Sequence, residues 1–214
     1  MDARYRSIIA NVEQIVRAKL SGLPHAYRYH GLEHTEQVVR NALAIAEAER
    51  LPGDDRSSAT ELPLLLISAW LHDVMIDTFY VGHEAAACRF VDAYFAGADS
   101  LFTGTLTMTE IDRIKSSIMA TKLPQEAPHQ LAAILADADL LYLGTNQFFP
   151  WSGRLREEHL HILRRTYTDT EWTEINIRFL REHTYYTPFA RNYCERGIET
   201  NLSLLTGELD APSM

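Results

Sequence analysis

The segment Leu64-Leu-Leu-Ile-Ser-Ala-Trp-Leu-His-Asp-Val74 places a histidine and an aspartate at the end of an almost continuous apolar run. Two further ionisable groups lie in similar surroundings: Asp137 in the apolar stretch 134–144, and His34 at the start of a helical apolar face. Ionisable side chains are rarely buried without partners, because an unpaired buried charge is strongly unfavourable. The chain must therefore fold so that these groups meet one another or a cation.

Nearly every segment has the apolar period of a helix, and none shows sustained strand-like alternation. Residues 61–76 and 129–143 are apolar almost all round, which is typical of central helices. Thr107-Met-Thr-Glu110 and Thr168-Asp-Thr-Glu171 have the spacing of capping boxes. We expect helices over about 3–20, 34–50, 61–76, 83–96, 107–121, 129–143, 152–167, 171–182 and 189–206. The sequence therefore predicts an all-α fold.

The chain has 214 residues, of which 46% are hydrophobic and 23% charged, as in an ordinary globular protein. It has no clear linker, internal repeat or low-complexity tract. We predict a single helical domain over residues 1–214, with residues 151–214 as its C-terminal helical extension.

The charge pattern argues against some classes of partner. A net charge of −9 does not favour extended nucleic acid, whose binding relies on clustered Lys and Arg. No apolar run is long enough to predict a membrane span, and the start lacks the apolar core of a signal peptide. The two cysteines, Cys88 and Cys194, are far apart and suit a reducing compartment. We expect a cytoplasmic protein that has neither a membrane nor extended nucleic acid as a partner.

The buried ionisable groups offer nitrogen and oxygen ligands for a divalent metal ion, such as Mn, Fe, Co, Ni, Zn or Mg. His34, His72 and Asp73 are three of the candidate ligands. Asp137 and Asp139 compete for the fourth position, because helix positions two apart face about 200° away from each other. The alternative for each residue is a separate core polar group that bonds to the backbone.

The order His, His-Asp, Asp on helical segments resembles the HD superfamily of metal-dependent phosphohydrolases. A narrower similarity, to a group of predicted HD phosphohydrolases, covers most of the chain. Its blocks are Tyr29-His-Gly-Leu-Glu-His-Thr35, Trp70-Leu-His-Asp73, His83-Glu84, Met119-Ala-Thr-Lys-Leu-Pro124, Asp137-Ala-Asp-Leu-Leu-Tyr-Leu-Gly144 and residues 171–187. The resemblance implies an HD-like multi-helix bundle around a metal site, and hydrolysis of phosphate esters with one or two divalent metals.

The resemblance also implies roles for individual residues. It makes His34, His72, Asp73 and Asp137 the metal ligands, since the family's Ala-Asp before a Leu-rich turn favours Asp137 over Asp139. Asp73 is in addition the natural group to accept a proton or to bridge to a second ion. Binuclear members carry more histidines between the His-Asp pair and the last aspartate, where this chain has only His83 and His129.

Four more residues are candidates for a role in catalysis or in substrate contact. Glu84 would orient water and His83 would contact phosphate or a second metal, although Glu84 at a helix start is favourable without any catalytic role. Lys122 would pair with phosphate, or would simply complement the dipole at a helix end. His30 lies in a loop and either contacts substrate or stacks with Tyr27 and Tyr29.

These residues together predict a phosphohydrolase that acts through metal-activated water on a small phosphate ester, with a nucleotide favoured. The aromatic cluster at Tyr185 and Tyr186, beside His183, could stack on a base. The main alternative is a metal-binding regulatory or sensor module without catalysis. A di-iron oxygenase on the same fold is the least favoured, because a richer set of histidines and carboxylates would be needed.

Overall fold

The structure, a computed structural model, describes residues 1–50, 61–97 and 102–210. These residues form nine α-helices and one short 3₁₀-helix, and no strand occurs among them, which confirms the all-α prediction. The elements are α1 (Ala3–Ser21), α2 (Leu32–Ala48), α3 (Glu61–Leu71), α4 (His83–Ala96), α5 (Met108–Met119), α6 (Gln130–Leu140), η1 (Leu141–Gly144), α7 (Phe148–Leu163), α8 (Asp169–Glu182) and α9 (Pro188–Asp210). Within the described residues, no helix is both long and apolar enough to cross a membrane.

The helices divide between two compact units. The first contains residues 1–23 and 30–139, and the second contains residues 24–29 together with those from Leu140 onward. The sequence predicts a C-terminal extension from residue 151, a position inside α7, whereas the C-terminal part of the second unit begins at Leu140. Every residue with a proposed role at the metal site belongs to the first unit.

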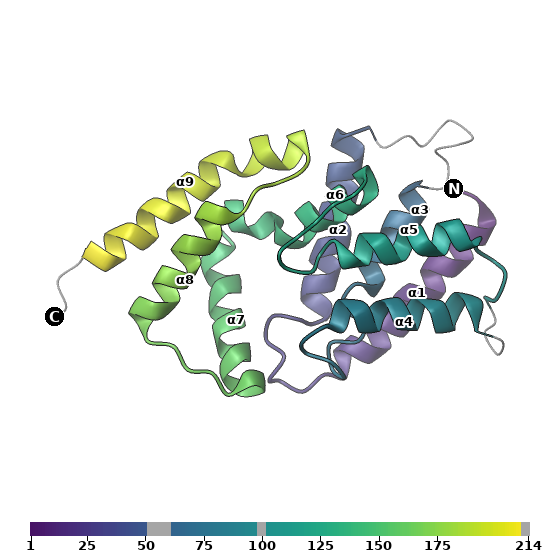
Figure 1. Ribbon diagram of the computed structural model, residues 1–214, viewed down its shortest axis with the longest axis horizontal. Coiled ribbons are helices and arrows are strands. Elements are labelled where there is room, and N and C mark those ends of the chain that lie inside the picture. The colour runs from purple at the N-terminus through teal and green to yellow at the C-terminus, as the bar shows by residue number, and fades with distance from the viewer. Residues whose placement is uncertain (51–60, 98–101, 211–214) are drawn as a thin grey trace. The chain divides into compact units, whose positions relative to one another are not determined.

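Helix α3 is central to the first unit. It contacts α1, α2 and α5, and α4 lies beside α5 (Figure 1). Every residue from Pro63 to Leu71 is buried, as expected for a helix that is apolar on all sides. This packing fixes where the chain leaves α3, which is the point at which His72 and Asp73 follow.

The end of α3 differs from the sequence-based prediction. The helix stops at Leu71 rather than near residue 76, and residues 72–78 form consecutive turns. The amide of Val74 donates to the Leu71 carbonyl at 3.2 Å, and Nδ1 of His72 lies 2.8 Å from the Ala69 carbonyl. These contacts satisfy carbonyl groups that would otherwise be left unpaired at the helix end. His72 and Asp73 are therefore turn residues directly after the helix.

Both predicted capping boxes are confirmed. The Glu110 amide donates to the Thr107 hydroxyl at 3.2 Å while the Thr107 amide donates to the Glu110 carboxylate at 2.6 Å. Thr168 and Glu171 repeat the arrangement at the start of α8. Each box satisfies two amide donors that the first helical turn leaves without partners.

In the second unit, α9 lies directly against η1 because two glycines allow a close approach. A Cβ atom on Gly197 would lie 1.8 Å from the carbonyl oxygen of Gly144, and one on Gly144 would lie 2.3 Å from the Cβ of Cys194. Asn201 adds a hydrogen bond from Nδ2 to the Leu143 carbonyl at 2.9 Å. The contact therefore depends on the absence of side chains at both glycines.

We expect Gly197→Ala to destabilise the protein by about 1–3 kcal/mol, since the added methyl group must displace backbone. Gly207→Ala on the same helix is the matched control, because a Cβ there meets no atom within 4 Å. That control should be neutral or should stabilise by up to about 1 kcal/mol through helix propensity. Urea denaturation followed by circular dichroism gives both values, and equal effects of the two substitutions would contradict this account of the α9 contact.

Candidate metal centre

Four side chains from three separate regions of the first unit meet in one buried group. His34 lies in the first turn of α2, His72 and Asp73 follow the end of α3, and Asp139 is in the last turn of α6. Their positions depend on where these helices begin and end, because each residue lies at or beside a helix terminus. We refer to these four residues as the first group.

The ligand atoms of the first group have the spacing of groups that share one metal ion. Nε2 of His34 lies 2.9 Å from Oδ1 of Asp139, and Nε2 of His72 lies 3.2 Å from Oδ2 of Asp73. The cross distances, from His34 to Asp73 and from His72 to Asp139, are both 3.8 Å. Ligands with metal bonds of about 2.1 Å lie roughly 3.0–3.4 Å apart in octahedral or tetrahedral sites. The distances of 2.9 and 3.2 Å lie within or next to that range, whereas the two cross distances of 3.8 Å are longer.

The orientation of His72 also suits a ligand. Its Nδ1 bonds to the Ala69 carbonyl at 2.8 Å, so the lone pair on Nε2 faces the group, as in many metal-binding histidines. Among the described residues, Nε2 of His72 and Oδ2 of Asp73 are buried atoms without a hydrogen-bond partner. Native structures rarely leave such atoms unsatisfied. A divalent metal would satisfy both, so the residues present fit this cofactor.

Electrostatic coupling within the site perturbs three of its side chains. Burial alone would lower the pKa of His72, but Asp73 and Asp139 outweigh it and raise this pKa to about 9. Burial likewise opposes the charged form of His83, whose pKa is nevertheless raised to about 9 by Asp73 and Glu84. Burial would raise the pKa of Asp73, yet His72 and His83 hold it well below its usual range. Without metal, the site is a buried network of ion pairs.

The structure reverses the expected choice between the two aspartates of α6. Asp139 joins His34 and His72, whereas Asp137 belongs to neither group of possible ligands and is fully buried elsewhere on the helix. The two positions face about 200° apart, so only one of them can point toward His34. Asn41 of α2 donates to the Ala138 carbonyl at 2.9 Å and so helps to fix the rotation of α6. Asp139 therefore takes the position beside His34 and His72 that the sequence predicts for Asp137.

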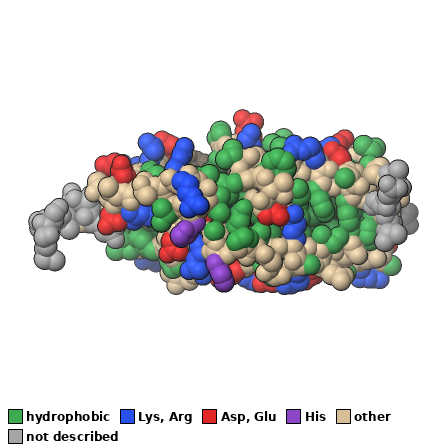
Figure 2. Space-filling view, turned by 90° about the horizontal axis from the view of Figure 1, so that it is seen from below, with side chains coloured by type: hydrophobic (Ala, Val, Ile, Leu, Met, Phe, Trp, Pro, Cys, Tyr) green, Lys and Arg blue, Asp and Glu red, His purple; other side chains and the backbone are tan. Residues whose placement is uncertain are grey.

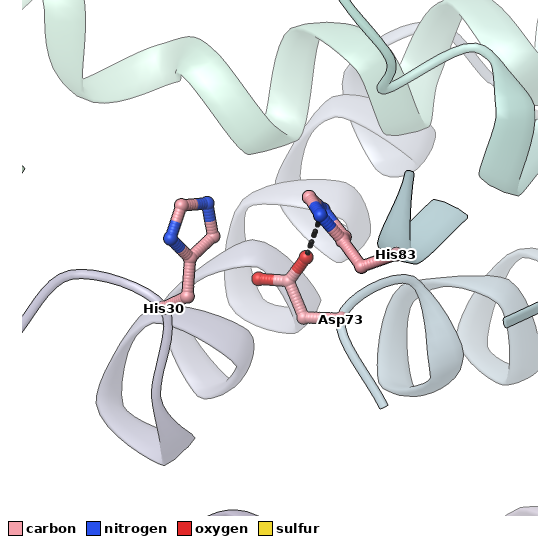
Figure 3. A group of neighbouring side chains, drawn as sticks. All are labelled: His30, Asp73 and His83. Carbon is pink, nitrogen blue, oxygen red and sulfur yellow. Dashed lines mark ion pairs between the residues drawn. The ribbon is translucent and has the colours of Figure 1, made fainter. Parts of the chain in front are cut away.

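A second group consists of His30, Asp73 and His83, whose ligand atoms all lie within 4.8 Å of one another. Figure 3 shows the Asp73 carboxylate between the two imidazoles. Nε2 of His83 lies 3.2 Å from Oδ1 of Asp73 and 3.7 Å from the Glu84 carboxylate, while its Nδ1 bonds to the Tyr80 carbonyl. His30 lies edge-on to the rings of Tyr80 and His83 and is thus part of the site.

Lys122 lies apart from these two groups in the contacts that the structure records. It is exposed just after α5 and lines an open groove. The other residues of that groove are Ser116, Met119, Leu123, Pro124, Glu126, Ala127 and Pro128. None of the described histidines or aspartates of the two groups is among the residues that line this groove.

Two other residues considered from the sequence have structural roles. Nδ1 of His129 accepts a hydrogen bond from the Ala132 amide at 3.1 Å at the start of α6, and His129 belongs to neither ligand group. Tyr185 is buried in the second unit, where its hydroxyl donates to the Leu140 carbonyl at 2.9 Å. A buried ring of this kind is not available for stacking on a base.

Similarity to a known protein is found at the level of the fold. No protein-family model matches the chain, and no curated protein matches its sequence. A crystal structure of a Lactobacillus plantarum protein, a Northeast Structural Genomics target, is similar, with a TM-score of 0.63 and 94% of each chain covered. The two chains share 16% sequence identity, so the similarity concerns the helical fold alone.

The stability of the metal-free protein should depend on pH. Because the pKa values of His72 and His83 are about 9 in the folded state, above the ordinary 6.5, their protonation contributes stability that is complete below about pH 6.5. This stability is lost as the pH rises through about 9. We expect Tm of protein in EDTA to fall over that interval, and added Mn²⁺ or Zn²⁺ to stabilise more at its upper end, since imidazoles bind metal when neutral. A rise in the metal-free Tm over the same interval would contradict these pKa values.

Substitution can test the assignment of the α6 ligand. Asp139→Asn should weaken metal binding by more than the roughly 10- to 100-fold that a supporting residue contributes. Asp137→Asn removes a buried carboxylate and should lower Tm, while metal affinity changes by less than that range. Elemental analysis after dialysis, together with titration of a competing chelator, measures both variants. Loss of metal from Asp137→Asn alone would restore Asp137 as the ligand.

Proposed function

We propose that this chain is a metal-dependent phosphohydrolase of the HD superfamily that acts on a small phosphate ester, with a nucleotide favoured. The metal ligands are His34, His72, Asp73 and Asp139. The order His, His-Asp, Asp, which resembles that superfamily in sequence, supports the proposal together with the spatial meeting of these residues.

One observation carries this proposal. The Asp73 carboxylate is 2% exposed and lies among imidazoles, with one of its oxygens lacking a hydrogen-bond partner. Its ion pair with Nε2 of His72, at 3.2 Å, does not have the geometry of a hydrogen bond, and an unsatisfied buried polar atom destabilises the fold by about 1–3 kcal/mol. A bound cation would satisfy this oxygen of Asp73.

The exposure of the site residues indicates the side from which a substrate approaches. The side chains of His34, His72 and Asp73 are at most 3% exposed, whereas those of Asp139, His83 and Glu84 are between 10 and 14% exposed. The first three therefore form the closed floor of the site. A phosphate ester would enter from the side of the other three.

The proposed hydrolysis depends on the metal and on the residues at the more exposed side of the site. A bound divalent metal supplies Lewis acidity, which acidifies water and polarises a phosphoryl oxygen. In the hydrolysis, a water oxygen would bond to phosphorus while the ester P–O bond breaks, and the leaving oxygen would take up a proton and depart as an alcohol. We assign Glu84 as the group that accepts the proton lost by water, because Oε2 of its carboxylate is buried and has no hydrogen-bond partner. His72 and Asp73 hold their positions through the Ala69 carbonyl and through each other.

The charge of the protein supports a compact substrate. The net charge of −9 opposes a polyanion, and on the face shown in Figure 2 the Lys and Arg side chains are interspersed with Asp and Glu. Extended nucleic acid needs a continuous basic surface, since its affinity comes mainly from contacts with phosphates. A single phosphate group needs only the local charge of the metal site.

A phosphatase screen tests the function. Metal-stripped protein reloaded with Mn²⁺, Co²⁺ or Zn²⁺ should release phosphate or nucleoside from one or more mononucleotides or sugar phosphates. Glu84→Gln should lower kcat by about 10²- to 10⁴-fold, as expected for a lost general base, with metal content retained. Glu157→Gln, at an exposed position of the second unit, is the control and should leave kcat unchanged.

Two results would reject the proposal. Processive degradation of oligonucleotides at moderate salt would point to an extended substrate. Inactivity of metal-loaded protein on every phosphate ester would instead favour a metal-binding regulatory module without catalysis.

A further inference from the structure

An open groove of about 610 Å³ lies where α5 ends and the chain continues toward α6. Five of its eight lining residues are apolar, and two of these, Met119 and Leu123, are 37% and 54% exposed. Lys122 and Glu126 add one charge of each sign. Small-molecule sites are hollows of about 300–1,000 Å³ with a mainly apolar lining and a few polar groups. The groove therefore has the size and composition of such a site.

The packing of α4 against α5 places one end of this groove at the level of Glu84. The two helices lie side by side and run in opposite directions (Figure 1). The Cys88 thiol of α4 lies 3.5 Å from the Lys115 carbonyl of α5. Glu84 lies one turn before Cys88 in α4. Met119 lies one turn after Lys115 in α5, so Met119 and Glu84 share one level in this antiparallel pair.

A hydrogen bond to α6 ties the other side of the groove to the helix that carries Asp139. Gln125, which lies within the lining segment 124–128, donates from Nε2 to the Ala136 carbonyl at 3.0 Å. Ala136 lies one turn before Asp139 in α6. The lining of the groove thus extends from the level of Glu84 to within one turn of Asp139. These two side chains belong to the more exposed side of the proposed metal site.

A phosphate ester bound at the metal must direct its leaving group away from the closed floor of the site. The side chains of that floor are at most 3% exposed, so they leave no room for atoms beyond the phosphate. The atoms that follow the ester oxygen can extend only on the side of Glu84 and Asp139. That side adjoins the groove.

We propose that the groove holds the organic leaving group of the ester, with a flat, largely apolar ring such as a nucleobase against Met119 and Leu123. This inference rests on the proposed function, because it concerns the leaving group of that reaction. It assigns the recognition of the base to the first unit, at the end of α5 and the segment that follows it.

The groups in the groove suit a nucleoside better than a short sugar or polyol. Apolar side chains gain free energy when a ring covers them, and a methionine sulfur makes favourable contacts with aromatic rings. The Lys122 ammonium offers three hydrogen-bond donors, and the Glu126 carboxylate accepts hydrogen bonds. Both residues are exposed in the groove, where they can reach the hydroxyl groups of a ribose and the polar edge of a base.

Substrates that differ only in the base test the inference. Ribose 5-phosphate and the 5′-mononucleotides AMP, GMP, CMP and UMP share the same ester bond to the C5 carbon of ribose. For Mn²⁺-loaded wild type, kcat/KM should be at least about 10-fold higher for one or more of the mononucleotides than for ribose 5-phosphate, since small apolar contacts discriminate by about 10- to 200-fold. Equal values for all five esters would overturn the inference.

Two variants connect this preference to the groove. Leu123→Ser removes an apolar contact, and Ser116→Phe fills part of the groove. Each should lower kcat/KM for the preferred mononucleotide by about 10-fold, mainly through KM, and leave kcat/KM for ribose 5-phosphate unchanged. Leu204→Ser is the matched control, because Leu204 is 53% exposed on α9, and it should match the wild type on both substrates.

A fall in kcat/KM that is equal for both substrates, or no fall for either, would also overturn the inference. Circular dichroism verifies that each variant retains its helices. If Leu123→Ser does not fold, Ser116→Phe decides the question together with the substrate series.

Binding of a nucleoside separates this inference from the proposed function. Titration with adenosine, cytidine, guanosine and uridine, followed by NMR, requires no catalysis. Binding to wild type that Ser116→Phe abolishes, in a protein that hydrolyses no phosphate ester, would refute the function and leave the groove as a nucleoside site. Hydrolysis of ribose 5-phosphate and the mononucleotides with equal kcat/KM would refute the role of the groove and leave the function standing.

Discussion

The buried carboxylate of Asp73 is the group on which the rest of the first unit depends. It is 2% exposed and ionised, because His72 and His83 keep its pKa well below the usual range. A buried charge of this kind destabilises a protein unless partners of opposite charge surround it in fixed positions. The helices that supply His34, His72 and His83 must therefore converge on one point, and the apolar packing of α3 provides the rigid support for that convergence.

The residues of the centre lie at helix termini rather than along helix faces. His34 is in the first turn of α2, His83 begins α4, Asp139 is in the last turn of α6, and the His-Asp pair follows α3. Helix bodies bury apolar side chains against one another, whereas helix ends bring backbone polar groups and turns close together. The carbonyls of Ala69 and Tyr80, which orient His72 and His83, come from such places. The proposed chemistry thus occupies positions where polar groups are already required by the fold.

The second unit has a separate source of stability. Its contact between α9 and η1 depends on Gly144 and Gly197, and Asn201 bonds across it to the Leu143 carbonyl. Tyr185, one of the aromatic residues that suggest base stacking in the sequence, is buried in this unit and donates a hydrogen bond to the Leu140 carbonyl. Base recognition by a nucleotidase would therefore have to come from residues other than Tyr185.

The sequence by itself determined the helical class, the starts of α5 and α8, and the burial of His72 and Asp73. These features depend on local periodicity and on capping contacts between residues three positions apart. The tertiary structure decided which aspartate of α6 faces His34, where α3 ends, and that His30 adjoins His83. The rotation of a buried helix is set by its neighbours, and Asp137 and Asp139 both have apolar neighbours at helical spacing in the sequence. His30 belongs to an irregular segment before Gly31, whose course has no periodic pattern, so only its packing against Tyr80 and His83 places it at the centre.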